Sequence, residues 1–235
     1  IEPKQGPWEL LRKHIKFVIC SGDKEHYKYV IRWLARLVQE PWTPGEVALV
    51  LRGGRGIGKG VLANSMCRIL GQHSVAVRNS KHVTGNFNAH MRDCILLYVD
   101  EAFWAGNKEA EGIIKGYITE PTIFVEPKNI NGKDRRNMLH VIMTSNQDWV
   151  IPAGEDERRF CVLDVSEHHK FDRPYFNKLV NEIENGGLAA MLYDLKHMKI
   201  SDFEVRDVPY TDALIMQKIL SLEPVHKWWL EKLKE

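Results

Sequence analysis

A glycine-rich segment, Gly53 to Lys59 (GGRGIGK), has the residues and spacing of a phosphate-binding loop. An apolar run, Val47 to Leu51, precedes this glycine loop, and a helical pattern, Val61 to Leu70, follows it. In that setting backbone N–H groups converge on phosphate oxygens, while the helix N-terminus and the Lys59 ammonium add positive charge. The segment therefore predicts a nucleoside triphosphate site, with a ligand-free glycine turn as the alternative. The predicted nucleotide-binding residues are Gly53, Gly54, Arg55, Gly56, Ile57, Gly58, Lys59, Gly60 and Val61.

The residue after the lysine departs from the usual pattern of such loops. Ser or Thr usually stands there and its hydroxyl ligates Mg²⁺, whereas this chain has Gly60. The backbone cradle and Lys59 remain, so nucleotide binding is expected to survive the change. A water can replace the lost oxygen, because Mg²⁺ usually keeps several waters. Gly60 therefore puts the rate of hydrolysis in question, not the ligand.

An acidic pair, Asp100-Glu101, directly follows a second apolar run, Cys94 to Val99. Ligands of α/β proteins gather at the carboxyl ends of the strands. We therefore expect Asp100 to hold Mg²⁺, through its waters, and Glu101 to orient and deprotonate the attacking water. A solvated acidic turn is the alternative. No histidine has metal-ligand spacing beside a cysteine or a carboxylate, so Asp100 is the predicted metal residue.

Polar residues also follow a third apolar run, Leu139 to Thr144. Asn146 lies just beyond it and is expected to hydrogen-bond the γ-phosphate and the lytic water. Further on, Arg158 and Arg159 are candidate arginine fingers, which stabilise transition-state charge on the γ-phosphate of a neighbouring subunit. We favour Arg158. The alternative is that both arginines pair with the acidic residues just before them.

A basic segment around Asn131-Gly132 lies between Thr122–Val125 and Met138–Met143, which predicts a β-hairpin with a long polar tip. The tip has no aromatic residue on which a base could stack, so nucleic acid would be bound through phosphates in a sequence-tolerant, salt-dependent way. A solvated basic turn is the alternative. The predicted DNA-binding residues are Lys128, Lys133, Arg135 and Arg136, with Asp134 the only acid among them.

Strands that alternate with helices around the glycine loop predict an α/β fold with a mainly parallel sheet. Residues 8–39 have helical periodicity, which Ser21-Gly22-Asp23 interrupts, so two helices joined by a turn are expected. The pattern is mostly helical again from Phe171, most clearly at Tyr175–Ile183 and Leu188–Lys196. We predict a helical unit at 1–44, an ATPase core at 45–166 and a C-terminal helical region at 167–235. In the last region Trp228 and Trp229 are expected to pack into a helical bundle.

The composition is that of an ordinary soluble globular protein, with 235 residues, 44% hydrophobic and 27% charged. No apolar stretch reaches the roughly 18 residues that span a bilayer. Four scattered cysteines, Cys20, Cys67, Cys94 and Cys161, indicate reduced thiols of a cytoplasmic protein, in the host cytoplasm if the chain is viral. The net charge of +2 requires any nucleic-acid surface to be local. The start at Ile1, without methionine, indicates a piece of a longer polypeptide.

The motifs occur in an order that resembles the superfamily 3 helicases, a branch of the AAA+ ATPases. The resemblance is strongest to the helicase modules of phage and plasmid primase–helicases. It is carried by GGRGIGKG, YVDEAFW, ITEPTIFVEPKNINGKDRRN, MTSNQDWVIPAG and DERRF. It extends into both flanks, SGDKEHYKYVIRWLARLVQEP and VPYTDALIMQKILSLEPVHKWW. The resemblance therefore covers most of the chain. It also implies that glycine is tolerated at position 60 in this phage-type branch.

The resemblance implies an AAA+-like P-loop ATPase core in a homo-oligomeric ring, usually a hexamer, with ATP and Mg²⁺ between subunits and the arginine finger supplied in trans. It also implies that the hairpin lines the central pore and grips single-stranded DNA, with Lys128 the best match to the motif lysine. A primase or polymerase domain is expected elsewhere in the polypeptide, and no membrane is involved.

Three functions compete at this stage. The first is an ATP-driven DNA helicase or translocase for phage or plasmid replication. The second is a nucleotide-dependent ring or clamp that binds single-stranded DNA with little hydrolysis, which Gly60 motivates. The third is a P-loop kinase or another metabolic enzyme. That class fits the glycine loop but does not explain the acidic strand end, the Asn146 segment and the basic hairpin together.

Overall fold

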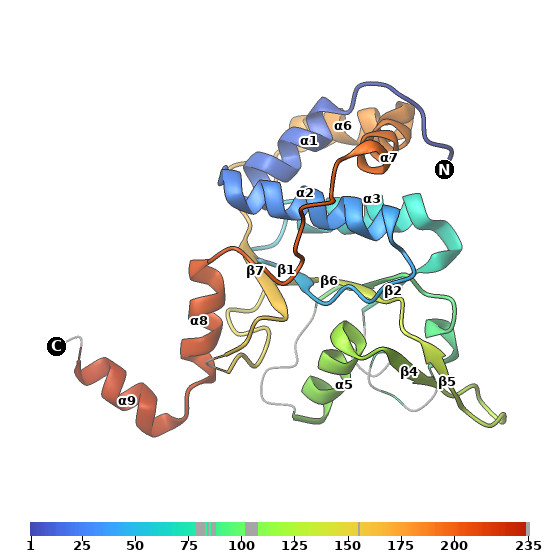
Figure 1. Ribbon diagram of the computed structural model, residues 1–235. Coiled ribbons are helices and arrows are strands. Elements are labelled where there is room, and N and C mark those ends of the chain that lie inside the picture. The colour runs from blue at the N-terminus through green and yellow to red at the C-terminus, as the bar shows by residue number, and fades with distance from the viewer. Residues whose placement is uncertain (79–82, 84, 86–87, 102–107, 155, 234–235) are drawn as a thin grey trace.

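A parallel sheet with helices on both faces forms the body of the protein in the computed structural model (Figure 1). The structure describes residues 1–235 except 79–82, 84, 86–87, 102–107, 155 and 234–235. In this described part, no helix combines the length and the apolar character needed to cross a membrane. The predicted α/β class with a mainly parallel sheet is confirmed.

Within the described residues, the main sheet has five strands in the order β2-β3-β6-β1-β7, and every neighbouring pair is parallel. The apolar runs before residues 53, 100 and 145 form β1, β3 and β6, as predicted, while β2 and β7 were not foreseen. The strands are β1 (Ala48–Arg52), β2 (Ser74–Val77), β3 (Leu96–Val99), β6 (His140–Ser145) and β7 (Phe160–Asp164). Because successive side chains of a strand point to opposite faces, continuous apolar runs fit strands that are covered on both sides.

Two hydrophobic cores lie on opposite faces of this sheet. Leu49 and Leu51 of β1 belong to one core and Ala48 and Val50 to the other, as the two-residue repeat of a strand requires. The first core includes residues from the N-terminal helices, α3 (Lys59–Leu70), α6 (Arg173–Glu182) and α7 (Leu188–His197). The second core includes residues from α5 (Lys108–Thr119) and α8 (Asp212–Ser221). In Figure 1 the helices of the first core lie above the sheet, α5 lies below it and α8 stands beside β7 on the left.

The helices whose positions were predicted, at 8–39, 61–70, 175–183 and 188–196, begin and end close to the predicted places, whereas the bounds of the other helices were not predicted. Asp23 caps α2 by accepting a hydrogen bond from the His26 N–H at 2.8 Å, so the turn at 21–23 does separate two helical stretches. The first stretch is α1 (Glu9–Lys13) continued by the π-helix η1 (His14–Ile19). The others are α2 (Lys24–Gln39), α3 (Lys59–Leu70), η2 (Gly71–His73), η3 (Ala89–Met91), α5 (Lys108–Thr119), α6 (Arg173–Glu182), η4 (Ile183–Gly187), α7 (Leu188–His197), α8 (Asp212–Ser221) and α9 (Pro224–Lys232).

The basic hairpin differs from the prediction in its second strand. β4 (Thr122–Val125) pairs antiparallel with β5 (Lys133–Arg136), with Val125 opposite Lys133. The segment 138–143 was the wrong partner, because His140–Ser145 is buried at all six positions and joins the main sheet as β6. Three of the four predicted DNA-binding residues therefore lie on strand β5 and only Lys128 lies in the connecting loop.

The expected helical bundle around Trp228 and Trp229 is also wrong. The chain turns away after α8, with Leu222 in an extended conformation, and α9 projects from the body (Figure 1). The two tryptophans are 51% and 55% exposed, and their ring centroids lie 5.1 Å apart. They pack against each other rather than into a core.

Candidate active site

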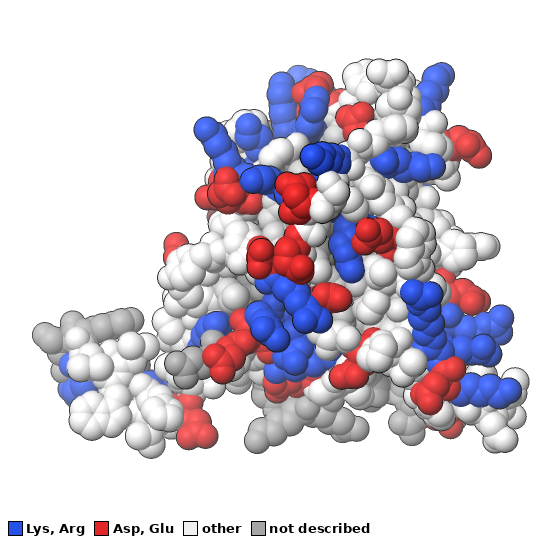
Figure 2. Space-filling model, viewed as in Figure 1, with Lys and Arg blue, Asp and Glu red and all other residues white. Residues whose placement is uncertain are grey.

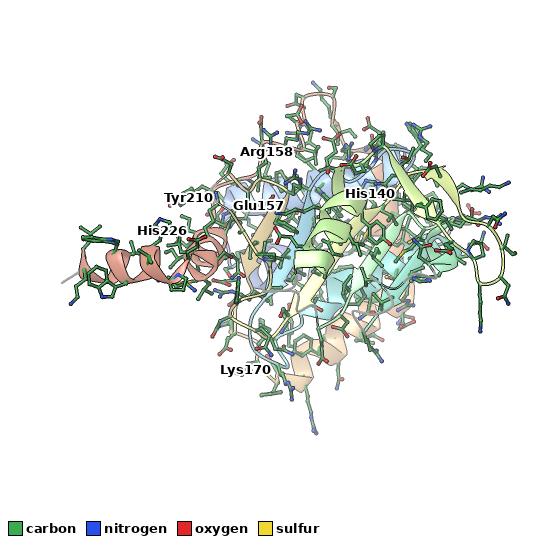
Figure 3. All side chains as sticks on the ribbon, turned by 90° about the horizontal axis from the view of Figure 1, so that it is seen from below. His140, Glu157, Arg158, Lys170, Tyr210 and His226 are labelled. Atoms are coloured by element: carbon green, nitrogen blue, oxygen red, sulfur yellow. The ribbon has the colours of Figure 1, made fainter. Side chains whose placement is uncertain are left out.

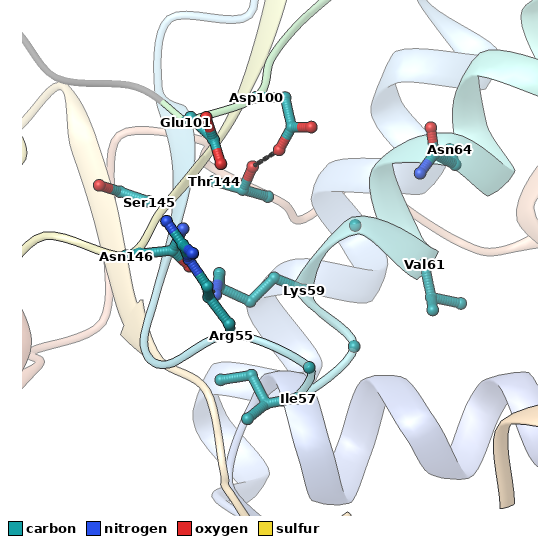
Figure 4. Close-up of a pocket in the computed structure, with 13 residues that line it drawn as sticks. Arg55, Ile57, Lys59, Val61, Asn64, Asp100, Glu101, Thr144, Ser145 and Asn146 are labelled. Atoms are coloured by element: carbon teal, nitrogen blue, oxygen red, sulfur yellow. Dashed lines mark hydrogen bonds between the residues drawn. The ribbon is translucent and has the colours of Figure 1, made fainter. Parts of the chain in front are cut away.

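The order of the strands brings three distant motifs to one edge of the sheet. β3, β6 and β1 are neighbours and run parallel, so their carboxyl ends lie side by side. These ends lead into Asp100, Asn146 and the glycine loop. A pocket of about 380 Å³ opens there (Figure 4). It is lined by Arg55, Gly56, Ile57, Gly58, Lys59, Gly60, Val61, Asn64, Asp100, Glu101, Thr144, Ser145 and Asn146.

Lys59 occupies the centre of this arrangement, at the first residue of α3. Its side-chain nitrogen Nζ donates hydrogen bonds to Asn146 Oδ1 at 2.9 Å and to the Gly53 carbonyl at 2.7 Å, and it also contacts the Gly54 carbonyl. The residue is only 8% exposed, and this burial lowers the pKa of Lys59, against the opposing effect of Asp100. The structure thus joins two residues that the sequence analysis had assigned to one site, although they are far apart along the chain.

His14, which the sequence analysis did not single out, contacts the glycine loop at Gly58. Gly58 has φ +92°, and a Cβ there would lie 2.6 Å from His14 Cε1. His14 Nε2 lies 3.1 Å from the Gly58 carbonyl and Nδ1 lies 3.0 Å from the Tyr175 hydroxyl. Burial lowers the pKa of His14 to about 4, so the ring is neutral at physiological pH. Nε2–H therefore donates to the Gly58 carbonyl and the tyrosine hydroxyl donates to Nδ1. No local pattern connects His14 with the glycine loop.

On the other side of the pocket, Asp100 is held by two neighbouring strands. The Thr144 hydroxyl donates to Asp100 Oδ1 at 2.7 Å, and Thr144 Oγ1 lies 3.3 Å from the Tyr98 hydroxyl. Glu101 has φ +58°, a conformation that residues with a side chain rarely adopt and that recurs at functional sites. Figure 4 shows Asp100 and Glu101 across the pocket from the glycine loop.

The donor set suits a magnesium ion bound together with phosphate groups. The pocket offers carboxylate, hydroxyl and amide oxygens from Asp100, Glu101, Thr144 and Asn146. Mg²⁺ prefers oxygen ligands, keeps several waters and typically takes one or two carboxylates plus substrate phosphates. Among the residues that the structure describes, no group of three or more His, Cys, Asp or Glu side chains could hold a metal ion by itself. The oxygen donors of the pocket thus suit a cation that also takes ligands from water and phosphate.

The two candidate arginine fingers do not line this pocket. Arg159 NH1 lies 3.5 Å from Oε1 of the buried Glu157, so Arg159 has an acidic partner within its own subunit, and its role as an arginine finger stays a prediction. Burial alone would raise the pKa of Glu157, but the Arg159 N–H and the Lys115 ammonium 2.9 Å away together lower it. Arg158 is exposed near the edge of the molecule in Figure 3, and none of the described residues forms an ion pair with its guanidinium.

The basic hairpin forms a second exposed feature, separate from the pocket lining. All of β5 is exposed, as is Lys128, and Figure 2 shows Lys and Arg side chains gathered over the position that β4 and β5 occupy in Figure 1. The tip itself has no aromatic residue, as the sequence analysis states, but the strand before the tip carries one. Phe124 on β4 is 55% exposed, and a Cβ on Gly132 would lie 2.4 Å from Phe124 Cζ. The hairpin therefore presents an aromatic ring beside its basic residues.

All four cysteines are free, and Cys20, Cys94 and Cys161 are buried. Burial raises the pKa of Cys94 to about 12 and that of Cys161 to about 12, so both thiols stay protonated. They act as core residues and take no part in the pocket.

The fold and the pocket define a class: a parallel α/β protein with a glycine loop, a buried lysine and an acidic pair at adjacent strand ends. Residues 51–159 match the model of a family of unknown function, DUF5906. The chain is also 24% identical over 200 residues to a protein named DNA primase-polymerase from Nitratiruptor phage NrS-1. That alignment covers 83% of this chain and 27% of the phage protein, so the chain spans about a quarter of its relative.

Solved structures share this fold over nearly the whole chain. An apo structure of the NrS-1 C-terminal region (305–718) superimposes with a TM-score of 0.84 at 19% identity, covering 98% of this chain and 58% of that one. The A form of the same region gives a TM-score of 0.82 at 20% identity, with 97% and 54% covered. At these identities the likeness establishes the fold.

Proposed function

We propose that this chain is the ATPase module of a phage or plasmid DNA replication protein, and that it couples ATP hydrolysis to movement along single-stranded DNA. One observation carries the proposal: Lys59 contacts Asn146, and Thr144 contacts Asp100, at three adjacent strand ends. A glycine loop alone fits many phosphate-binding proteins. The added carboxylate pair and amide are the groups that position and activate a water for phosphoryl transfer. The similarity to a phage primase-polymerase supports the replication context.

The proposal gives a specific role to each of the polar groups that line the pocket at the glycine loop and the strand ends. The loop N–H groups and the Lys59 ammonium bind the β- and γ-phosphates, and Asn146 orients both the γ-phosphate and the attacking water. Glu101 accepts the proton of that water. Asp100 would hold Mg²⁺, with water between them, and the ion would neutralise negative charge on the phosphate oxygens. Because Thr144 donates to Asp100, the carboxylate is already oriented before the nucleotide binds.

The proposal includes a ring of identical subunits, usually a hexamer, with ATP at the interfaces. Arg158 supports it, since this exposed guanidinium lies outside the pocket of its own subunit and is available to a neighbour's γ-phosphate. Head-to-tail contacts that close generate such rings. The hairpin carries Lys128 and Arg136 toward the DNA backbone in the central channel. The rest of the longer protein supplies a primase or polymerase domain, and the complex works in the host cytoplasm.

ATP hydrolysis with and without single-stranded DNA tests the proposal directly. Lys59→Ala, Glu101→Gln and Arg158→Ala should each abolish turnover, whereas Arg92→Ala, at an exposed arginine on another part of the surface, should not. Mixing Lys59→Ala with Arg158→Ala subunits should restore part of the activity, because a mixed interface can contain one intact lysine and one intact arginine. Absence of any turnover by the wild type in an assembled ring contradicts the motor.

The second candidate is a ring or clamp that binds ATP and single-stranded DNA without much hydrolysis. Gly60 favours it, since the loop lacks the hydroxyl that usually ligates Mg²⁺. In that case ATP would raise the particle mass, and the Glu101→Gln substitution would change the rate of ATP turnover only a little. Measuring particle mass and turnover on one sample separates the two functions.

A further inference from the structure

The space beside Gly60 is already occupied. A Cβ at this position would lie 3.3 Å from the Tyr98 hydroxyl and 3.3 Å from the Asn64 side-chain nitrogen. Both distances are somewhat shorter than ordinary van der Waals contact, so a side chain at position 60 would crowd the two groups and push them back by a few tenths of an ångström. Position 60 of the glycine loop thus carries no hydroxyl of its own, but the Tyr98 hydroxyl of β3 lies next to it.

The Tyr98 hydroxyl is held in a fixed orientation. Tyr98 lies on β3, two residues before Asp100, and is only 3% exposed. The single proton of the Thr144 hydroxyl goes to Asp100, so Tyr98 donates its own proton to Thr144 Oγ1. The phenolic oxygen can then accept a hydrogen bond, and it lies next to Gly60 at the start of α3.

We propose that the Tyr98 hydroxyl takes the place of the missing Ser or Thr hydroxyl of the glycine loop, by accepting a hydrogen bond from a water of the nucleotide-bound magnesium ion. Tyr98 is a positioning residue that acts through water and through the Thr144–Asp100 pair. Glycine at position 60 then suits this arrangement, because a Cβ there would crowd the tyrosine oxygen. This inference rests on the proposed ATP site and adds a residue that no glycine-loop pattern contains.

Tyr98→Phe removes only the hydroxyl and is the decisive variant. ATP affinity is measured by titration calorimetry in EDTA and at increasing Mg²⁺ concentrations, with no turnover required. In Tyr98→Phe, the Mg²⁺ concentration that gives half of the maximal increase in ATP affinity should rise about 10-fold, as found when other outer-shell partners of a bound metal are removed. The ATP affinity in EDTA should stay unchanged. Tyr29→Phe is the matched control, since Tyr29 is also buried and its hydroxyl donates to the distant Val205 carbonyl at 2.6 Å.

A rescue variant gives the second readout. Gly60→Ser alone should weaken Mg²⁺-dependent binding through crowding, whereas the same change in Tyr98→Phe should restore the Mg²⁺ requirement toward the wild-type value. An unchanged Mg²⁺ requirement in Tyr98→Phe overturns the inference, and so does tighter binding in Gly60→Ser with Tyr98 present. If the wild type and Lys59→Ala both fail to bind ATP in any condition, the proposed function itself falls, and this assignment with it.

Discussion

Two buried histidines should make this fold sensitive to mild acid. His14 lies under the glycine loop, and His140 lies inside the sheet, edge-on to Trp33 with ring centroids 5.6 Å apart. Burial lowers the pKa of His14 to about 4; burial, together with Arg36, lowers that of His140 to about 3. His140 Nδ1 lies 3.2 Å from the Met138 carbonyl, and its Nε2 has no hydrogen-bond partner among the described residues, so protonation of Nε2 would bury an unpaired charge.

The sign of the effect follows from linkage. An unfolded histidine has a pKa of about 6.5, so well above this value both states hold neutral rings and neither histidine affects stability. Below it the unfolded chain takes up protons that the native state refuses, and the free energy of unfolding falls with pH until the folded pKa is reached. From about pH 7 to about pH 5 each histidine removes roughly 2 kcal/mol, or roughly 4 kcal/mol together. That is a large part of the 5–15 kcal/mol typical of a domain.

The assay is denaturant unfolding at a series of pH values between those limits. His140→Phe keeps a ring against Trp33 and should remove about half of the pH dependence, because one of the two titrating groups is gone. His226→Ala should leave it unchanged, since His226 is exposed on α9, whereas His140 lies in the interior (Figure 3). The reasoning is refuted if the wild type loses less than about 1 kcal/mol over this range, or if His140→Phe retains the full slope.

Three further predictions concern residues outside the pocket. Glu157→Ala should cost about 1–3 kcal/mol in urea unfolding, because two backbone N–H groups lose their carboxylate acceptor while Lys115 keeps Glu111 as a partner. A loss below about 0.5 kcal/mol would contradict this. On the hairpin, Arg136→Ala should flatten the salt dependence of single-stranded DNA binding, whereas Phe124→Ala should weaken binding and leave the salt slope unchanged. Equal salt slopes in both variants would exclude a phosphate contact by Arg136. Trp228→Ala should change stability by less than about 0.5 kcal/mol, since this ring is half exposed, and a larger loss would place it in a core.

The sequence determined the local elements of this protein. The apolar runs before the glycine loop, Asp100 and Ser145 became β1, β3 and β6, because continuous apolar stretches that end in polar or glycine residues form buried strands. The cap at Asp23 and the helical repeat after it likewise fixed α2. These features depend on neighbours along the chain, so a single sequence is enough to read them.

Competition between segments was decided only in three dimensions. Both 133–136 and 138–143 could follow Thr122–Val125 in a hairpin, and the sequence pattern favoured the apolar segment. In the fold this segment buries far more surface between β1 and β3, so the basic segment is left to pair with β4. The exposure of Trp228 has the same origin, since an apolar helix face is buried only if another element meets it.

Some residues of the candidate site could likewise be found from the sequence, and others only from the tertiary structure. Sequence supplied Lys59, Asp100, Glu101 and Asn146, since each follows directly on a recognisable strand or turn. The strand order placed these four residues around one pocket. Tertiary packing added two contacts that no sequence spacing predicts, His14 with Gly58 and Tyr98 with Gly60. Contacts of this kind depend on how distant elements pack, because hydrogen bonds and close approaches are set by position in space and not by separation along the chain.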